Sequence, residues 1–371
     1  MRPHGTLGHV ETQRVVLADQ DDPLRLRGGG RLDHVEVAYE TYGTLSPARD
    51  NAVFICHALT GDAHAAGLHV GAKKRGWWDN LIGPGKPVDT DRFFVISPNL
   101  LGGCSGTTGP LSTDPATGAP YCLDFPILHM TDLVAVHRRL AAHLGVERLH
   151  AAVGGSLGGM QVLQWAIDDP NAIDRAVLVA ASARLTPENI AFSAVGREAI
   201  MSDPDFCGGR YVEQGVFPWR GQKVARMMAH ITYVSAGSLD TRFGRRRRSR
   251  GDDWTLGPDY EVEHYLQHQG TVFLDRFDAL SYLYLTRLLD YFDPFADPGT
   301  ADALRRTRTR FQLTSFDSDW RFDTTQSLAL AAQLTSLGVQ ADHAELASPF
   351  GHDSFLLEPP GYHDRIAGFL G

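Results

Sequence analysis

The sequence predicts an α/β protein in which a mostly parallel sheet, covered by helices on both faces, carries an inserted helical segment. Two observations indicate the sheet: short, continuously apolar runs recur along the chain, and amphipathic helical patterns separate them. A third observation indicates the insertion, because residues 186–300 show helical periodicity and no convincing strand. A length of 371 residues is typical of such a sheet domain with one insertion.

The first strands lie in the amino-terminal third of the chain. Residues 35–42 alternate apolar and polar side chains and end at Gly43, which predicts an edge strand. Residues 52–56 form a continuous apolar run and predict a buried parallel strand, and residues 92–97 predict a third strand. The glycine-rich stretch 101–110 lacks a Gly-Lys-Ser/Thr ending and opens no long helix, so it does not indicate a phosphate loop.

The middle of the chain continues the alternation. Thr131 is a favourable N-cap, and the apolar residues that follow through Leu144 fall on one helical face. Residues 151–155 then predict a strand, residues 160–166 a helix and residues 175–181 another buried strand. Because parallel strands need crossover connections, this order predicts a parallel sheet covered on both faces.

The pattern divides the chain into three segments. Residues 1–185 supply the first part of the sheet domain, residues 186–300 the helical segment, and residues 301–371 the remainder of the sheet domain. In the last segment, residues 309–316 and 341–346 predict strands, with an amphipathic helix between them. We expect the helical segment to be a lid that covers the site described below and excludes water from it.

Composition indicates a globular protein and excludes some partners. Hydrophobic residues make up 43% and charged residues 21% of the chain, which suffices for a large core. The net charge of −9 argues against a nucleic-acid partner. The arginine run at 245–248 has no interleaved aromatic residues and lies between Gly244 and Gly251, so we interpret it as a solvated surface loop.

No stretch approaches the roughly 18 continuous apolar residues of a membrane span, and residues 1–10 contain no apolar segment of a secretion signal. We therefore expect a cytoplasmic protein without a membrane partner. The cysteines form no Cys-x-x-Cys pair and have no ligand cluster near them, so we expect reduced thiols, no metal site and no bound cofactor. The cysteines are Cys56, Cys104, Cys122 and Cys207.

The stretch around Ser156 indicates chemistry. It reads Gly154-Gly155-Ser156-Leu157-Gly158 between an apolar run and a helical pattern, which is the strand–turn–helix context of a G-x-S-x-G nucleophile elbow. The glycines at 154 and 158 leave room for a strained turn that exposes the serine hydroxyl beside a helix amino terminus. The alternative is an ordinary glycine-rich turn, because the motif alone is weak.

An imidazole and a carboxylate complete a serine relay in the order that this architecture requires. The imidazole takes the serine proton, and the carboxylate fixes the tautomer of the imidazole. His352 follows the final predicted strand in a Gly-His-Asp turn, whereas His57 and His64 flank an early turn and are expected to shape it. Asp317 and Asp319 both follow the preceding strand, and periodicity does not choose between them.

Backbone donors near the serine are needed for the oxyanion that forms during acyl transfer. We expect them to be the N–H of Leu157, directly after the serine, and the N–H of Leu59 in the turn that follows the strand at 52–56. These groups would gather at the carboxyl edge of the parallel sheet, where sites of such folds form.

Several motifs together resemble a known family. They are His57-Ala58-Leu59-Thr60-Gly61, Gly76-Trp77-Trp78-Asp79-Asn80 with Ile82-Gly83-Pro84-Gly85, the stretch 99–109, the elbow at 154–160, Ser318-Asp319-Trp320 and Gly351-His352-Asp353. Over about residues 10–370 the sequence is similar to the homoserine O-acyltransferases of the α/β-hydrolase type. The resemblance implies an α/β-hydrolase fold, an acyl-carrying elbow serine, an acyl-coenzyme A donor, a homodimer and the first committed step of methionine synthesis.

The resemblance also assigns roles to individual residues. It implies that Asp319, and not Asp317, is the acid of the triad. It places the ammonium of homoserine at Asp353 and the carboxylate at Arg226, with Tyr233 as a third contact. In the alternative, purely structural interpretation, Asp353 caps a turn and Arg226 is a surface residue whose methylene stem packs on apolar neighbours.

One residue bears on the identity of the donor. Members of the family that use acetyl-coenzyme A commonly have an apolar residue two places after the catalytic Asp, where this chain has Arg321. A succinyl group ends in a carboxylate, and a guanidinium can satisfy it where burial unpaired would cost several kcal/mol. We therefore expect succinyl-coenzyme A as co-substrate. The alternative is that Arg321 points to solvent or pairs with a nearby acid.

Other functions stay open at this point. The same residues would serve a homoserine O-acetyltransferase, a serine O-acyltransferase or a plain serine hydrolase, because one methylene in a pocket is worth only about 1–3 kcal/mol. A non-catalytic binding module would require the ordered triad to be incidental. The sequence favours acyl transfer to homoserine by a ping-pong route through an acyl-serine.

Overall fold

A computed structural model describes residues 5–249, 254 and 256–371 of the chain. The beginning of the segment searched for a secretion signal (residues 1–4) and the far end of the arginine-rich loop (residues 250–253 and 255) lie outside the described residues. The strands are β1 (Gln13–Ala18), β2 (Leu24–Arg25), β3 (Arg31–Leu32), β4 (Val35–Tyr42), β5 (Ala52–Cys56), β6 (Ile82–Gly83), β7 (Val88–Asp89), β8 (Phe94–Pro98), β9 (Leu149–Gly155), β10 (Ile173–Val179), β11 (Arg310–Phe316) and β12 (Ala341–Leu346).

The helices alternate with these strands in the first and last parts of the chain and cluster between them. They are α1 (Met130–His143), α2 (Leu157–Asp168), α3 (Pro187–Met201), α4 (Trp219–Tyr233), α5 (Ala236–Arg242), α6 (Glu261–Leu274), α7 (Ala279–Tyr291), α8 (Gly299–Arg306), α9 (Thr324–Ser336) and α10 (Tyr362–Leu370). A 3₁₀ segment, Gly351–Leu356, follows β12.

Within the described residues, the main sheet has eight strands in the order β1-β4-β8-β5-β9-β10-β11-β12. From β8 to β12 each neighbouring pair is parallel, whereas β4 runs antiparallel to both β8 and β1. The predicted mostly parallel sheet is therefore confirmed. In parallel neighbours the carboxyl ends meet at one edge, so residues that follow β5, β9, β11 and β12 come together there.

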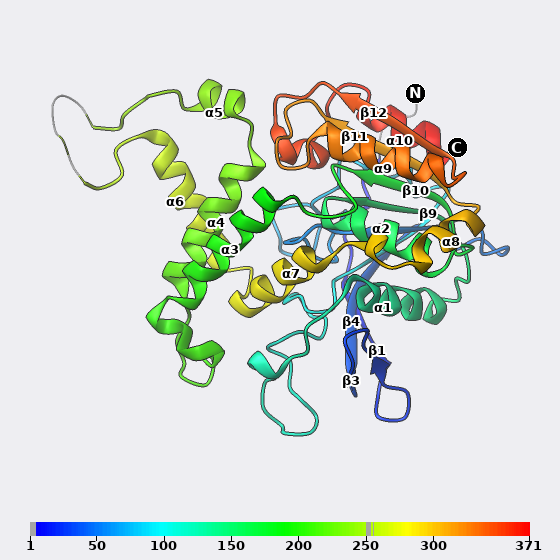
Figure 1. Ribbon diagram of the computed structural model, residues 1–371, viewed down its shortest axis with the longest axis horizontal. Helices are drawn as coiled ribbons and strands as arrows, with labels where there is room; N and C mark the ends of the chain where they lie inside the picture. The colour runs from blue at the N-terminus through cyan, green and yellow to red at the C-terminus, as the bar shows by residue number, and fades with distance from the viewer. Residues whose placement is uncertain (1–4, 250–253, 255) are drawn as a thin grey trace.

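Apolar clusters on both faces explain the continuous apolar runs. In β9, Ala152 packs into the cluster formed with α1 and α2, while Ala151 and Val153 pack into the opposite cluster with α10. Successive side chains of a strand point to opposite faces, so a strand covered on both sides needs apolar residues at every position. Figure 1 shows helices in front of the sheet and behind it.

Two local predictions were wrong. The strand predicted at residues 35–42 is not at the edge, because β1 pairs with it on its outer side. The pattern of β1 is weak, since Val16 is 48% exposed and the pairing is irregular near it. Thr131 is not the N-cap of α1: the helix begins at Met130 after His129, and Asp132 closes a capping box by accepting from the His129 N–H at 2.7 Å.

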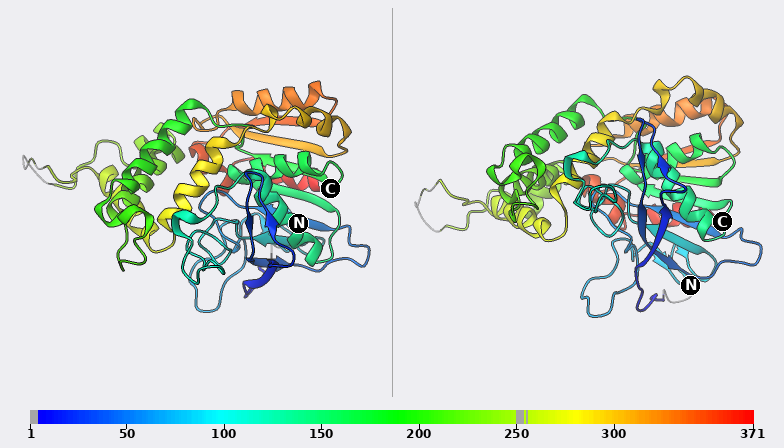
Figure 2. Two further views of the ribbon diagram at one scale, coloured as in Figure 1. Left: turned by 60° about the horizontal axis from the view of Figure 1, so that its bottom comes forward. Right: turned by 90° about the horizontal axis from the view of Figure 1, so that it is seen from below.

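The described residues between 186 and 300 form helices and loops without a strand. Helix α4 packs against both α3 and α6, and all views show this group at one end of the molecule (Figures 1 and 2). Helix α7 contributes Leu280, Leu285 and Leu288 to the same apolar cluster as α1 and α2, whereas α3, α4 and α6 contribute fewer buried residues, among them Ile200, Ala225 and Phe273. The inserted segment is thus anchored in the sheet domain through α7.

The remaining sequence predictions concern surface and membrane properties. In the arginine-rich loop, Arg246 lies 3.3 Å from Glu261, and Arg247 pairs with Asp259, so these charges are matched locally. All four cysteines are free thiols. Of the helices in the described part of the chain, none combines the length and the apolarity needed to cross a membrane.

Candidate active site

Ser156 lies in a strained turn between β9 and α2. Its backbone has φ 56° and ψ −126°, a combination that residues with a side chain rarely adopt. A Cβ at Gly154 would come within 2.2 Å of the Gly158 carbonyl carbon, and one at Gly158 would come within 2.0 Å of the Cys56 oxygen. Only glycine fits at both positions, which explains why the elbow needs the G-x-S-x-G pattern.

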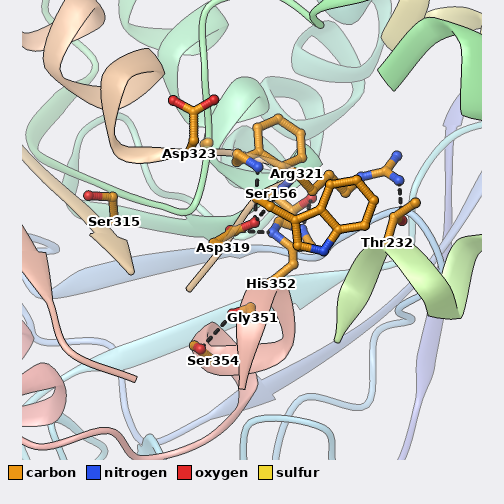
Figure 3. A network of polar contacts seen from close by, with 12 residues as sticks. Ser156, Thr232, Ser315, Asp319, Arg321, Asp323, Gly351, His352 and Ser354 are labelled. Carbon is orange, nitrogen blue, oxygen red and sulfur yellow. Dashed lines mark hydrogen bonds and ion pairs between the residues drawn. The ribbon is translucent and has the colours of Figure 1, made fainter. Parts of the chain in front are cut away.

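Three side chains that are far apart in sequence meet at this turn (Figure 3). His352 Nε2 lies 2.9 Å from Ser156 Oγ, and His352 Nδ1 lies 2.8 Å from Asp319 Oδ2. Because the carboxylate can only accept, Nδ1 carries the hydrogen and Nε2 is free to take the serine proton. The arrangement can therefore activate a serine hydroxyl as a nucleophile.

The geometry distinguishes the two aspartates that follow β11. Asp319 is buried, and its second oxygen, Oδ1, accepts the backbone N–H groups of Arg321 at 3.0 Å and Phe322 at 2.9 Å. Asp317 instead accepts the backbone N–H of Ser348 at 2.9 Å and holds the β12 loop. The structure thus brings Asp319, and not Asp317, to the imidazole.

The turn that carries His352 is packed on several sides. Its ring stacks on Phe322 with centroids 4.9 Å apart and lies 6.0 Å from the ring of Tyr233, at the end of α4. Gly351 has φ +68°, and a Cβ there would come within 2.6 Å of the Ser235 backbone nitrogen. The Ser235 hydroxyl donates to the Pro349 carbonyl, so the turn is bound directly to the inserted segment.

The two backbone N–H groups expected to hold an oxyanion belong to turns that follow neighbouring strands. The β5–β9 pairing aligns Cys56 with Gly154, so the turn after each strand lies at the same edge of the sheet. Among the described residues, neither the Leu59 nor the Leu157 backbone N–H has an acceptor. Leu157 is the first residue of α2, where the N–H groups are free and the helix dipole favours negative charge.

A buried network that the sequence did not predict positions the Leu59 turn. Gln161, on α2, donates to the His57 carbonyl at 3.0 Å and accepts from His137 at 2.8 Å. His57 Nε2 accepts the Leu100 N–H at 3.1 Å, so His57 Nδ1–H must donate to the Ala58 carbonyl, 2.7 Å away. Burial lowers the pKa of His57 and keeps it neutral. The expectation that His57 shapes the turn agrees with this geometry.

On the other side of the serine, the groups expected to bind substrate are poorly satisfied. The Arg226 guanidinium lies over Phe273 at 4.4 Å and Tyr233 at 5.6 Å from the ring centroids, and its buried Nε and Nη1 have no hydrogen-bond partner among the described residues. Within the described residues, the Asp353 carboxylate has no hydrogen bond or ion pair. Burial raises the pKa of Asp353, while nearby His352 and Arg226 oppose that rise.

His230 belongs to the same wall and was missed from the sequence. It stands four residues after Arg226 and three before Tyr233, so all three share one face of α4. Its Nδ1 lies 3.3 Å from the Tyr265 hydroxyl, and its buried Nε2 has no hydrogen-bond partner in the part of the chain that the structure describes. Burial, reinforced by Arg226 and other arginines, lowers the pKa of His230 to about 3. Helical spacing from Arg226 was the signal that could have found it.

Arg321 lines a narrow cavity near the serine. It is only 9% exposed, and no carboxylate among the described residues lies within ion-pair distance of it. The alternatives of a solvent-facing or acid-paired arginine do not hold. The cavity also touches Leu59, and its other walls are mostly apolar or aromatic. They are Phe192, Ser193, Met228, Ala229, Tyr233, Tyr282 and Thr286.

One cluster outside this site has a donor set that metals accept. Glu40, His64 and His69 bring ligand atoms within 4.8 Å of one another, and a carboxylate with two imidazoles suits zinc. The Glu40 carboxylate accepts from His64 at 3.1 Å, from His69 at 2.7 Å and from the Tyr42 hydroxyl at 2.7 Å. Burial disfavours the charge of Glu40, but these donors outweigh it and lower the pKa. This network ties the loop after the Leu59 turn to β4.

The fold and the triad define a serine acyl-transfer enzyme of the α/β-hydrolase class. A model of the alpha/beta hydrolase fold family matches residues 51–359. Among solved structures, the homoserine O-acetyltransferase of Bacillus anthracis superposes with a TM-score of 0.91 at 27% identity, covering 98% of each chain. The structure of esterase E22 superposes with a TM-score of 0.88 at 26% identity, covering 98% of this chain and 100% of that one.

Sequence relatives narrow the class. The chain is 87% identical to a homoserine O-succinyltransferase of Nocardioides sp. strain JS614, over 99% of this chain and 100% of that protein. It is 50% identical to a homoserine O-acetyltransferase of Caulobacter vibrioides, over 94% of this chain and 92% of that protein. The chain belongs to the homoserine O-acyltransferase family.

Proposed function

We propose that the protein transfers a succinyl group from succinyl-coenzyme A to the hydroxyl of L-homoserine and so supplies O-succinyl-L-homoserine for methionine synthesis. The observation that carries the choice of donor is Arg321, a buried guanidinium in a cavity that touches the Leu59 turn and with no acid partner among the residues that the structure describes. A buried cation is costly unless an anion meets it, and the far carboxylate of a succinyl group is such an anion. The name of the relative at 87% identity supports the same choice.

In the first half-reaction, Ser156 Oγ attacks the thioester carbonyl while His352 Nε2 takes its proton. The oxyanion of the tetrahedral intermediate is held by the N–H groups of Leu59 and Leu157. Collapse of the intermediate breaks the carbon–sulfur bond, and the proton on His352 passes to the departing thiolate. The products of this step are free coenzyme A and succinyl-Ser156.

In the second half-reaction, homoserine occupies the wall formed by Arg226, His230 and Asp353. Its carboxylate meets the free N–H groups of Arg226, and its ammonium meets Asp353, which the arriving positive charge keeps ionised. His352 then removes the proton of the homoserine hydroxyl, which attacks the acyl-serine. The ester oxygen of Ser156 leaves and regains a proton from His352.

Transfer of the acyl group to homoserine must be faster than hydrolysis of the acyl-serine by water. We propose that residues 186–300 act as a lid, with α4 covering the serine and leaving little room for water. Aromatic contacts around the His352 ring support this role, because they exclude solvent from the base. The segments 1–185 and 301–371 then form the catalytic domain, to which α7 fastens the lid.

A donor-by-acceptor matrix tests the proposal. Purified enzyme is assayed with succinyl- or acetyl-coenzyme A against homoserine or serine, and succinyl transfer to homoserine is expected to have the highest kcat/KM. Replacing Arg321 with Leu should lower kcat/KM for succinyl-coenzyme A by about 10²-fold or more, the worth of a buried charge-assisted pair, and shift preference toward acetyl. An unchanged preference would refute the assignment of the donor.

The alternatives predict other results in the same matrix. A homoserine O-acetyltransferase, the name of the relative at 50% identity, would prefer acetyl-coenzyme A. A serine O-acyltransferase would prefer serine as acceptor. A hydrolase, as the esterase structure allows, would release the free acid as fast without an acceptor as with one.

The assembly, location and cofactor needs are also proposals. We infer a homodimer, as the family resemblance implies, and light scattering on the purified protein tests it. We also infer that the protein is located in the cytoplasm. We propose that no metal or cofactor takes part, since the triad and backbone donors supply every proton transfer and charge contact of the mechanism. Activity that falls on treatment with a chelator would contradict this and direct attention to Glu40, His64 and His69.

A further inference from the structure

Arg321 is held by the inserted segment. Its Nη1 donates to Thr232 Oγ1 at 2.6 Å, an interaction between residues 89 positions apart (Figure 3). Thr232 lies in the last turn of α4 and is fully buried. The guanidinium also lies 5.5 Å from the centroid of the Tyr233 ring, which favours a cation over its face. The lid therefore fixes where the guanidinium points.

The hydroxyl of Thr232 has no capacity left for a ligand anion. It donates its hydrogen to the Ala229 carbonyl at 2.8 Å, so towards Arg321 it can only accept. An acyl carboxylate, which also only accepts, gains nothing from this hydroxyl directly. Thr232 thus acts as a positioning residue: it occupies one N–H of the guanidinium and leaves the others free.

Tyr282 supplies a second donor in the same cavity. It comes from α7, is only 4% exposed and lines the cavity together with Arg321 and Leu59. Its hydroxyl forms no hydrogen bond within the described residues, and burial raises the pKa of Tyr282, so it keeps its proton. A Cβ at Gly196, on α3, would lie 3.0 Å from this hydroxyl, so the glycine leaves the room that the hydroxyl occupies.

The other residues that line the cavity limit which ligand Arg321 and Tyr282 can bind. Its remaining walls include Phe192, Met228 and Ala229, and no acidic residue is among the residues that line it. Tyr282 and Arg321 line a mostly apolar and aromatic space, in which Ser193 and Thr286 are the other short polar side chains. Such a space matches a ligand whose near part is aliphatic and whose end is anionic. A short dicarboxylic acyl chain has this chemistry.

We propose that Arg321 and Tyr282 jointly donate to the terminal carboxylate of the acyl group, with Thr232 as the residue that positions Arg321. The proposal rests on the proposed function and deepens it, because it assigns donor selection to three elements, the β11 loop, α4 and α7, and not to one arginine. Discrimination then depends on the lid, which supplies two of the three residues.

The test compares two donors of nearly equal length, succinyl-coenzyme A and butyryl-coenzyme A, which differ in the terminal charge. In Tyr282→Phe, the ratio of kcat/KM for succinyl to that for butyryl is expected to fall about tenfold, the worth of one hydrogen bond to a charged acceptor. Tyr284→Phe is the matched control, because the Tyr284 hydroxyl donates to the Phe125 carbonyl at 2.6 Å outside the cavity. Its ratio should stay at the wild-type value.

Thr232 is tested by a pair of variants. Thr232→Val keeps the shape but loses the acceptor, and its ratio should also fall by about tenfold. Thr232→Ser restores the hydroxyl and should restore the ratio. A merely structural role would lower kcat/KM for both donors together and leave the ratio unchanged, and that result would overturn the proposal.

The outcomes separate this inference from the proposed function. If the wild-type enzyme does not prefer succinyl to butyryl, the proposed donor itself is wrong. If it does prefer succinyl, and either Tyr282→Phe or Thr232→Val keeps the wild-type ratio, only the three-residue receptor is wrong.

Discussion

The two walls of the site around Ser156, one from the sheet domain and one from the inserted helical segment, differ in how completely their polar groups are satisfied. On the wall of the sheet domain, His352 has both ring nitrogens hydrogen-bonded, and the Asp319 carboxylate accepts three hydrogen bonds. On the lid wall, Arg226 and His230 have buried nitrogen atoms that find no partner within residues 5–249, 254 and 256–371. Proteins rarely leave buried polar atoms unpaired, so each such atom calls for an explanation.

The difference distinguishes the catalytic relay from the groups that we propose bind substrate. The relay is preorganised, so its geometry needs no rearrangement when the acyl group arrives. Among the described residues, the lid wall holds the unmet nitrogen atoms of Arg226 and His230, and Asp353, beside His352 in the sheet domain, is an unmet acceptor. We propose that the carboxylate and the ammonium of an amino acid are their partners. We expect substitutions in the first wall to stop chemistry and substitutions in the second to weaken one substrate selectively.

The largest expected effect comes from breaking the relay at its acid. Asp319→Asn should lower kcat by about 10⁴-fold, because an amide cannot hold the imidazole in the required tautomer. Asp317→Asn is the matched control: its oxygen can still accept the Ser348 N–H, and kcat should stay close to wild type. Similar losses in the two variants, measured by steady-state kinetics, would contradict the assignment of the acid.

An intermediate effect should follow from removing the unpaired guanidinium of the lid wall. Arg226→Met should lower kcat/KM for homoserine by about 10²- to 10³-fold, the worth of a buried charge pair. Formation of the acyl-enzyme from the donor, followed by mass spectrometry without homoserine, should proceed as in the wild type. Arg220→Met is the control on the same helix, because Arg220 is exposed and pairs with Asp205 at 2.8 Å. Equal slowing of both half-reactions by Arg226→Met would place Arg226 in the relay.

The smallest effect concerns acid stability. The folded-state pKa of His230 is lowered to about 3, so below its unfolded value of about 6.5 the unfolded chain binds more protons. The stability that neutral His230 contributes is complete above about pH 6.5 and is lost as the pH falls toward 3. Between about pH 8 and pH 5 this loss is about 2 kcal/mol.

Urea unfolding at the two pH values measures the effect. His230→Gln cannot take up a proton, so its free energy of unfolding should fall by about 2 kcal/mol less than that of the wild type. The same fall in both proteins would show that His230 is not held neutral.

Local rules made much of the site predictable. The elbow could be predicted because Gly154 and Gly158 are needed wherever a serine turn approaches a neighbouring backbone this closely. The order of Ser156, acid and His352 could be predicted because parallel strands bring the segments after them to one edge. The edge strand β1 could not be predicted, because a half-exposed strand at the edge of a sheet has little apolar pattern. The N-cap of α1 could not be predicted either, because His129 is not a usual capping residue.

Other features depend on contacts between distant segments, which no local pattern records. Asp317 and Asp319 follow the same strand, and only the path of the loop determines which one reaches the imidazole. Arg321 could be singled out by family resemblance, but its partner Thr232 lies on a helix whose docking the sequence does not specify. The lid could be predicted as helical, yet its inward-facing residues could be chosen only after α4 was in place.

The Ser235 hydroxyl donates a hydrogen bond to the Pro349 carbonyl, and Gly351 lies close to the Ser235 backbone. These contacts affect how substrates can enter and leave the site. If the end of α4 opened, it would carry the His352 turn with it and separate the imidazole from Ser156 in every catalytic cycle. If the proposed function is correct, coenzyme A, a long and bulky leaving group, passes in and out while this corner stays shut. Substrates and products then enter and leave without movement of this corner, and His352 keeps its alignment with Ser156 from one cycle to the next.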